Sequence, residues 1–174
     1  SGNLQSLLQD KGVAYSGSDG DACLKTWNKS RCKEILSSHN IPTPRWVSVS
    51  ELSAESSKLS SDKFNIFEPQ STLFLKPEED GSSIDVFKIS NEADLLQAIH
   101  DCTNNKRPFI FEECIDHREL TVPILNGRCL PALEIITNET FYNYDAKYVN
   151  EDTQLLSINH SPQEKEILES LCLQ

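Results

Sequence analysis

Basic residues are scarce in this sequence, and their scarcity excludes several kinds of partner. The 174 residues include 16 Lys and Arg against 27 Asp and Glu, which gives a formal net charge of -11. Nucleic acids and anionic membrane surfaces are bound mainly through clustered Lys and Arg. The composition therefore predicts neither a nucleic-acid partner nor a membrane partner.

Long apolar segments and sorting signals are also missing. No apolar run approaches the ~18 residues of a membrane span. No basic segment followed by an apolar stretch marks a signal peptide. Methionine is absent, and an opening Ser-Gly-Asn is typical of a piece taken from a longer protein. We therefore expect a cytoplasmic protein, present here in part.

The cysteines show none of the spacings that would indicate a structural role. No Cys-x-x-Cys pair occurs, and no paired histidines accompany the cysteines at zinc-site spacing. We expect free thiols in a reducing cytosol, in preference to disulfides or a zinc site. The six residues are Cys23, Cys32, Cys102, Cys114, Cys129 and Cys172.

Motifs for the common nucleotide sites are absent as well. Neither G-x-x-x-x-G-K-[ST] nor G-x-G-x-x-G occurs, so a P-loop or a Rossmann site is not expected. The four histidines are scattered and lack the spacing of a Ser-His-Asp triad or a metal site, so surface or structural roles are expected. They are His39, His100, His117 and His160.

The sequence does contain a mixture of helix and strand patterns. Amphipathic helices are predicted over residues 3–12, 21–38, 91–102 and 161–171. Strand patterns occupy residues 45–50, 107–115, both arms of a hairpin over 73–90, and both arms of a second hairpin over 120–136. A short strand and turn are predicted over 13–21, and a short helix and loop over 51–70. Hairpins without a regular βαβ rhythm predict an α+β fold with antiparallel sheets.

Three local signals sharpen these boundaries. Asn126-Gly127 indicates a type I′ turn in the second hairpin. Ser90 or Asn91 is predicted to cap the helix over 91–102. Ala93, Leu96, Ile99 and His100 are predicted to lie on one side of that helix. Ser161-Pro-Gln-Glu164 is a capping box that begins the last helix.

Some charged residues have a suggestive context, although the pattern alone leaves their role open. Lys76 ends an apolar strand, where an ammonium group is costly unless it meets an anion. With Lys29 and Lys147 it could hold a triphosphate, or all three could be ordinary surface lysines. The acids around the end of the 107–115 strand could be solvated, or could contact a ribose or a metal. These acids are Glu112, Glu113 and Glu119.

Several segments, taken in order, resemble the D-alanine–D-alanine ligases. GVAYSGSDGDACLKTWNKSRCKEIL, followed by IPTPRWV, resembles their G-x-P-Y-T-G-S, a helix ending in Asp-Lys, and I-P-T-P. LFLKPEEDGSS resembles their Lys-Pro…Gly-Ser-Ser loop, and FIFEECIDHRELTVPIL is similar to their strand, hinge and Glu-Phe-Thr-Val. LPALEI and TFYNYDAKYVNEDTQ are similar to their L-P…I and tyrosine-rich D-Y-x-A-K-Y loop. The resemblance covers nearly the whole chain.

The resemblance implies an ATP-grasp fold, in which two α+β lobes grip ATP. Residues 1–17 would be a remnant of the N-terminal substrate domain, 18–115 the central lobe, and 116–174 the first part of the C-terminal lobe. The family joins two D-alanines through an acyl phosphate for peptidoglycan synthesis, and the parent protein is expected to be a homodimer. The magnesium ligands of the family lie in Arg-x-Asp and Glu-x-Asn segments that this sequence does not contain. The fragment alone is therefore expected to be inactive.

The resemblance also assigns nucleotide contacts to positions in this sequence. Lys29 and Lys76 would touch the α- and β-phosphates, and Lys147 the terminal phosphates. The loop over the phosphates would be formed by the backbone N–H groups of Gly81, Ser82 and Ser83. The adenine amino group would donate to Glu112. The remaining hinge bonds and the ribose contacts would come from the backbones of Glu113 and Ile115 and from the side chain of Glu119.

Catalytic roles follow from the same resemblance. Ser82 and Tyr148 would orient the first D-alanine and close the site, with Lys147 at the transferred phosphate. Three positions depart from the family pattern: Asn28 replaces its Asp, Asp85 its second glycine, and Glu113 a common Lys. The resemblance allows the three acids before Gly81, since a mobile loop can aim their side chains outward while its backbone N–H groups face the nucleotide.

Two alternatives stay open at this stage. One is a related ATP-grasp ligase that takes D-lactate or D-serine as its second substrate. The other is a degenerate, non-catalytic module, because Asn28 and Asp85 depart from the family pattern at positions close to the expected phosphates.

Overall fold

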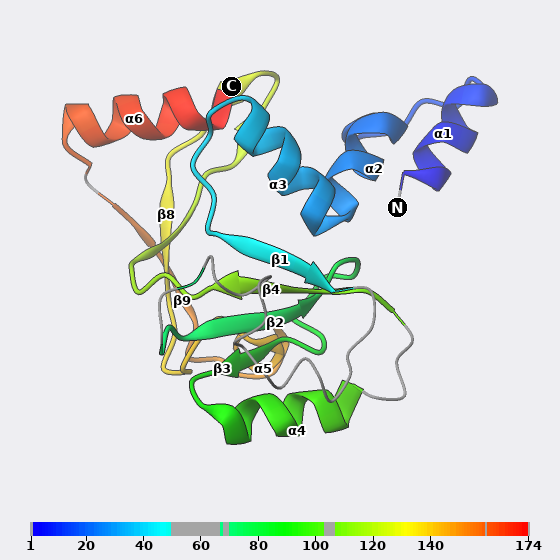
Figure 1. The fold of residues 1–174 in the computed structure, drawn as a ribbon. Coiled ribbons are helices and arrows are strands. Elements are labelled where there is room, and N and C mark those ends of the chain that lie inside the picture. The colour runs from blue at the N-terminus through cyan, green and yellow to red at the C-terminus, as the bar shows by residue number, and fades with distance from the viewer. Residues whose placement is uncertain (1, 50–66, 68–69, 103–106, 159, 174) are drawn as a thin grey trace. The chain divides into compact units, whose positions relative to one another are not determined.

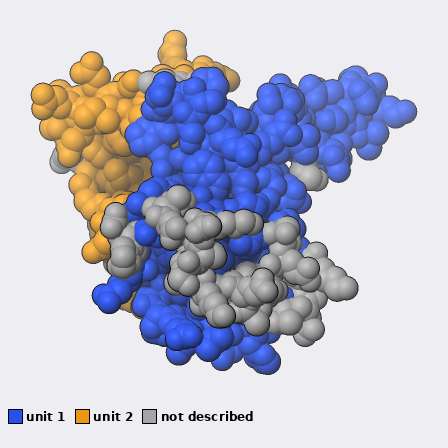
Figure 2. All heavy atoms as spheres, viewed as in Figure 1, with its two compact units in different colours: residues 1–81, 85–114 blue, residues 82–84, 115–174 orange. Residues whose placement is uncertain are grey.

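The computed structural model describes residues 2–49, 67, 70–102, 107–158 and 160–173 (Figure 1). The chain forms two compact units (Figure 2). Unit 1 comprises Ser1–Gly81 and Asp85–Cys114, and unit 2 comprises Ser82–Ile84 and Ile115–Gln174. The predicted helix and loop over 51–70 lie almost entirely outside the described residues. The ligase domain boundaries remain a prediction, because these units are defined by compactness alone.

Unit 1 contains a four-stranded antiparallel sheet in the order β1-β4-β2-β3. Its strands are β1 (Trp46–Val49), β2 (Leu73–Pro77), β3 (Phe87–Ile89) and β4 (Phe109–Glu113). The central strand β4 has neighbours on both sides, and its first three residues, Phe109 to Phe111, are fully buried. This explains its continuous apolar sequence. The predicted hairpin over 73–90 is confirmed, because β2 and β3 pair with Leu73 opposite Ile89.

The helices of unit 1 differ from the prediction at two places. They are α1 (Asn3–Asp10), α2 (Gly20–Trp27), α3 (Lys29–Ser38) and α4 (Glu92–Cys102). The single helix predicted over 21–38 is wrong, since Asn28 has an extended backbone with ψ 118° and its side chain accepts from the N–H of Arg31 at 2.9 Å. Asparagine favours such an N-cap over a helix interior. The strand predicted within 13–21 is also wrong, because no strand lies there and Asp19 instead caps α2.

The buried face of α4 shares only Ile99 with the side named from the sequence. Asn91 caps the helix as expected, accepting from the N–H of Asp94 at 3.0 Å. The residues that face the core are Leu95, Ala98, Ile99 and Cys102. Leu96 is 51% exposed, and Ala93 and His100 are exposed as well. Apolar residues of this helix lie on two neighbouring sides, one with Leu96 and one with Leu95. Packing against β3 buries the side that contains Leu95.

Unit 2 contains two small antiparallel sheets and two helices. β5 (Glu119–Thr121), β8 (Leu133–Ile136) and β9 (Gln154–Ser157) form one sheet in the order β5-β8-β9, and β6 (Ile124–Leu125) pairs with β7 (Arg128–Cys129). The type I′ turn is confirmed by φ angles of 51° at Asn126 and 70° at Gly127. The helices are α5 (Tyr144–Tyr148) and α6 (Pro162–Leu173).

The capping box of α6 is confirmed, with reciprocal hydrogen bonds between Ser161 and Glu164 of 2.8 and 3.2 Å. The antiparallel α+β architecture predicted from the sequence is likewise confirmed. None of the helices in the described part of the chain is long and apolar enough to cross a membrane.

The corrected face of α4 can be tested with two adjacent leucines. Leu95 is 1% exposed, so Leu95→Ala should lower the free energy of unfolding by about 2–5 kcal/mol. Leu96→Ala removes the same atoms from an exposed position and should change the free energy of unfolding by less than about 0.5 kcal/mol. Urea denaturation of both variants measures the difference. Equal losses would contradict the assigned face.

Candidate functional site

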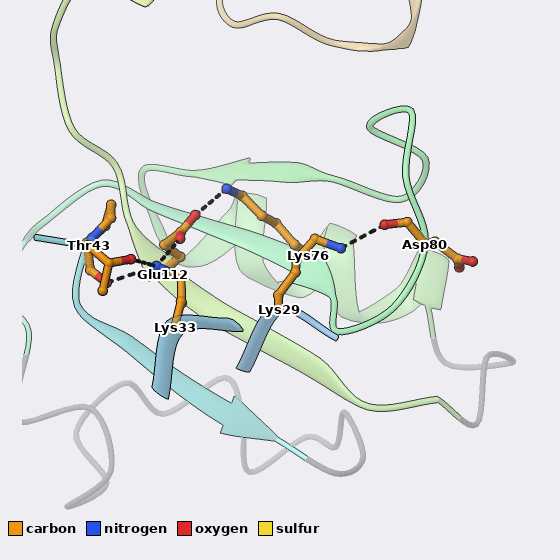
Figure 3. Close-up of polar contacts among 7 residues, drawn as sticks. Lys29, Lys33, Thr43, Lys76, Asp80 and Glu112 are labelled. Carbon is orange, nitrogen blue, oxygen red and sulfur yellow. Dashed lines mark hydrogen bonds and ion pairs between the residues drawn. The ribbon is translucent and has the colours of Figure 1, made fainter. Parts of the chain in front are cut away.

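A buried carboxylate on β4 of unit 1 is held by two lysines (Figure 3). The Glu112 side chain comes from β4 and is only 8% exposed as a residue. Lys33 Nζ lies 2.5 Å from one carboxylate oxygen, and Lys76 Nζ contacts the other. Burial by itself would raise the pKa of Glu112, but the ion pair with Lys76 and the hydrogen bond from Lys33 outweigh it. The pKa of this carboxyl therefore lies below its usual value.

The two lysines are held very differently. Lys33 on α3 is 7% exposed, and its Nζ also donates to Thr43 Oγ1 at 2.7 Å and to the carbonyl of Pro44 at 3.0 Å. Lys76 on β2 has a more exposed side chain and lies over the ring of Phe74, 4.9 Å from its centroid. Lys33 is therefore held by three polar partners at 8% side-chain exposure, whereas the Lys76 side chain is 24% exposed and contacts Glu112 and the ring of Phe74.

Lys29 lies near this cluster, at the first position of α3. Its Nζ donates to the carbonyl of Asp80 at 2.9 Å, and its backbone N–H donates to the carbonyl of Glu78 at 2.8 Å. Burial, followed by the positive charge of Lys76, lowers the pKa of the Lys29 ammonium. Both effects destabilise the protonated amine of Lys29. An anion bound beside it would stabilise this positive charge.

Glu78 is a second buried carboxylate beside Lys29. It is 8% exposed and accepts hydrogen bonds from Asn28 Nδ2 at 3.0 Å, from Ser30 Oγ at 2.9 Å and from Ser48 Oγ. Burial by itself would raise its pKa, but these three donors outweigh it and lower the pKa of Glu78. The helix break at Asn28 and the end of β2 are thereby tied together around Lys29.

The expectation that the loop acids point outward is wrong for Glu78, which is buried, whereas the Asp80 side chain is 42% exposed and pairs with Arg107. Glu79 is exposed, as expected, and accepts from Trp27 Nε1 at 3.3 Å. Partners that are distant in the sequence therefore decide the direction of each acid.

The tip of the β2–β3 loop belongs to unit 2, where it contacts the segment around α5. Ser82 Oγ lies 2.9 Å from Tyr148 Oη, and Ser83 Oγ accepts from Lys147 Nζ at 2.7 Å. Ser83 Oγ also donates to the carbonyl of Tyr142 at 3.0 Å. The structure thus brings together the three residues predicted to be catalytic, Ser82, Lys147 and Tyr148.

The remaining predicted residues lie around the connection from β4 to β5. The Glu113 side chain pairs with Arg45 at 2.7 Å, and its backbone N–H donates to the carbonyl of Arg45 at 2.9 Å. A hinge bond from Glu113 to a ligand would therefore have to use its carbonyl. Ile115 and Glu119 are exposed and belong to unit 2, whereas Glu112 and Glu113 belong to unit 1.

Sequence reasoning missed Lys33, Glu78 and Arg107. Lys33 follows Lys29 by four residues, so both lie on one side of α3, and that spacing was the available signal. Glu78 looked like one of three loop acids. Arg107 contacts both Asp80 and Asp85, and the unexplained Asp85 was the only hint of it.

A metal site is not formed by the residues that the structure describes. They contain no group of three or more His, Cys, Asp and Glu side chains placed to hold an ion. All six cysteines are free thiols.

Comparison with known proteins identifies the family of this chain. Residues 35–173 match the family described as "D-ala D-ala ligase C-terminus". The chain belongs to this ligase family. A D-alanine–D-alanine ligase of Pseudomonas putida is 35% identical over 153 residues, which is 88% of this chain and 46% of that protein. The chain thus spans about half the length of the curated relatives it matches.

Solved ligase structures share the fold. The D-alanine–D-alanine ligase of Bacillus anthracis aligns with a TM-score of 0.76 and 26% identity over 98% of this chain and 54% of that one. A structure of the Bacillus anthracis ligase complexed with ATP aligns with a TM-score of 0.73 at 22% identity, covering 98% of this chain and 52% of that one. The predicted ATP-grasp architecture is confirmed, with the lobes present in part.

The buried ion cluster gives a direct stability test. Glu112→Gln leaves Lys33 and Lys76 without a negative partner and should lower the free energy of unfolding by about 3 kcal/mol. Glu113→Gln, one residue further on, removes a partly exposed partner of Arg45 and should cost much less. Chemical denaturation at neutral pH measures both. A loss for Glu113→Gln as large as that for Glu112→Gln would refute the central role of the buried cluster.

Proposed function

We propose that this chain is the ATP-binding part of a D-alanine–D-alanine ligase, which joins two D-alanines for peptidoglycan synthesis. The observation that carries the proposal is the different attachment of three neighbouring lysines. Lys33 and Lys76 share the Glu112 carboxylate, whereas Lys29 Nζ is held by the carbonyl of Asp80. Lys29 and Lys76 would therefore be able to turn to a polyphosphate while Lys33 still compensates Glu112.

The different attachment of the two lysines suggests how a nucleotide would be accepted. Lys76 would turn from Glu112 to a phosphate, while Lys33 stays and continues to compensate the carboxylate. Glu112 would then be able to accept a hydrogen bond from the adenine amino group without becoming an unpaired buried charge. Lys29 would hold the neighbouring phosphate, whose negative charge would compensate its partly buried ammonium group.

The hinge and ribose contacts are proposed for residues at and after the end of β4. The Glu113 carbonyl and the Ile115 N–H would bind the adenine ring edge, and Glu119 would bind the ribose hydroxyls. The Glu113 N–H is already used by Arg45, which restricts Glu113 to the acceptor role. The substitution of Glu for a common Lys at 113 is harmless in this arrangement, because only the backbone is used.

The loop and α5 would act on the reacting groups. The backbone N–H groups of Gly81, Ser82 and Ser83 would cover the phosphates, with Lys147 at the group that is transferred. Ser82 and Tyr148, already hydrogen-bonded, would orient the first D-alanine. ATP, as a substrate, supplies the phosphoryl group that activates the D-alanine carboxylate.

The residues described here contain no group of three or more His, Cys, Asp and Glu side chains placed to hold a metal. We propose that the magnesium ligands of the whole protein lie in other segments. A homodimeric parent and a cytoplasmic location are likewise proposals, based on the family. No observation favours D-lactate or D-serine as the second substrate, or a degenerate module.

Nucleotide titration tests the proposal. The chain should bind ATP, and GTP about tenfold or more weakly, because the guanine carbonyl faces Glu112 where adenine offers a donor. Lys76→Ala should weaken ATP binding about tenfold by removing a charge-assisted contact. Lys88→Ala removes an exposed lysine of β3 and serves as the control for net charge. The absence of ATP binding in isothermal titration calorimetry would refute the proposal.

The lowered pKa of Lys29 predicts how ATP affinity depends on pH. As the pH rises toward that pKa, which lies below the usual 10.5, the amine loses its proton and phosphate affinity falls. Lys29→Arg keeps its charge, so its affinity should stay constant over about pH 7 to 10. Parallel pH profiles of the two proteins would instead mean that Lys29 does not contact the phosphates.

A further inference from the structure

The base of the β2–β3 loop is closed by a single arginine within unit 1. One terminal nitrogen of Arg107 contacts the Asp80 carboxylate, and the other contacts the Asp85 carboxylate. Asp80 and Asp85 stand on either side of the segment proposed to cover the phosphates. Arg107 therefore links the beginning and the end of this segment.

Strand pairing explains why residue 107 lies beside the loop. β2 and β4 pair with Pro77 opposite Phe109, and the N–H of Glu78 donates to the carbonyl of Pro108 at 3.0 Å. The residue before Pro108 is thereby placed next to the start of the loop. The Arg107 guanidinium also lies 5.5 Å from the ring centroid of the fully buried Phe109. A cation over an aromatic ring on a central strand is held in a defined position.

The loop backbone needs such a constraint. Four residues other than glycine have left-handed φ angles: Asp80 at 94°, Ser82 at 59°, Ser83 at 57° and Asp85 at 52°. Residues of this kind keep such conformations only where their surroundings impose them. At the base of the loop, Arg107 holds both aspartates, and Lys29 Nζ holds the Asp80 carbonyl at 2.9 Å.

The same contacts determine the charge beside the proposed phosphate site. Without Arg107, Asp80 and Asp85 would both lose a compensating positive charge. The charge of Asp80 acts on Lys29, so this loss would oppose a polyanion that approaches Lys29. The positive charge of Arg107 is close enough to Lys29 to contribute to the lowered pKa of its amine. Arg107 thus belongs to the same electrostatic neighbourhood as the lysines.

We propose that Arg107 is a positioning residue for ATP. It neutralises Asp80 and Asp85 and fixes the base of the loop, so that the N–H groups of the loop can meet the phosphates. The inference rests on the proposed ATP-binding function. It also explains how this chain accepts an aspartate at 85, where the resemblance predicts glycine, since Arg107 supplies the matching charge.

The test compares two nucleotides that differ in their phosphates. Arg107→Ala should raise the Kd for ATP about tenfold and change the Kd for AMP by less than about twofold, because only the polyphosphate meets the released carboxylates. Arg107→Ala combined with Asp80→Asn and Asp85→Asn should return the ATP Kd to within about threefold of the original. Lys88→Ala is the control for loss of one positive charge. Competition with a fluorescent ATP analogue gives all the values.

A second variant keeps Arg107 and so does not depend on the stability of Arg107→Ala. Asp80→Asn with Asp85→Asn removes both ion pairs but leaves neither carboxylate behind, so the ATP Kd should stay within about threefold of the original, with little effect on AMP. A loss of ATP affinity as large as that of Arg107→Ala would overturn the neutralising role of Arg107. Equal losses for ATP and AMP in Arg107→Ala would also overturn it, because they would indicate a purely structural residue.

Failure of ATP binding and failure of the role of Arg107 give different results. If the unsubstituted chain binds no ATP, the proposed function fails and the role of Arg107 fails with it. If it binds ATP and the ATP-to-AMP affinity ratio is unchanged by Arg107→Ala, only the role of Arg107 is overturned.

Discussion

The buried carboxylate of Glu112 between Lys33 and Lys76 is the interaction on which the rest of the structure depends. A charge on a central strand is costly unless it is compensated, and here it is compensated twice. The fixed lysine fastens α3 to β4, and the more exposed one lies at the end of β2. Because Glu112 has two lysine partners, it would keep one of them if the other turned to a ligand. The same ion cluster thus stabilises the sheet and would prepare it for a polyphosphate.

The loop after β2 shows how an acidic sequence can still serve an anion. Glu78 is turned inward and tied to the start of α3, while Asp80 and Asp85 are held by Arg107. Only Glu79 of the first three acids is left exposed. The tip, in contrast, carries serines that contact Tyr148 and Lys147 in unit 2. Local pairing of each acid removes most of the repulsion that the composition suggests.

Much of the fold could be predicted from the sequence, because its signals are local. The Asn-Gly turn, the Ser161 capping box and the apolar strand β4 each depend on neighbouring residues alone. The break at Asn28 and the buried face of α4 could not be predicted, because the contacts with Glu78 and with the sheet decide them. For the same reason, the sequence pointed to Lys76 and Glu112 but missed Lys33 and Arg107. Burial and long-range pairing make these two important, and neither leaves a periodic signal.

The central claim is that Lys33 remains on Glu112 while Lys76 turns to the phosphates. NMR of the chain with isotope-labelled lysine side chains, titrated with ATP, tests it most directly, with single Lys→Arg variants used to assign the signals. The account predicts that the signals of Lys29 and Lys76 shift with saturation while that of Lys33 stays in place. A shift of Lys33 with Lys76 unchanged would contradict it.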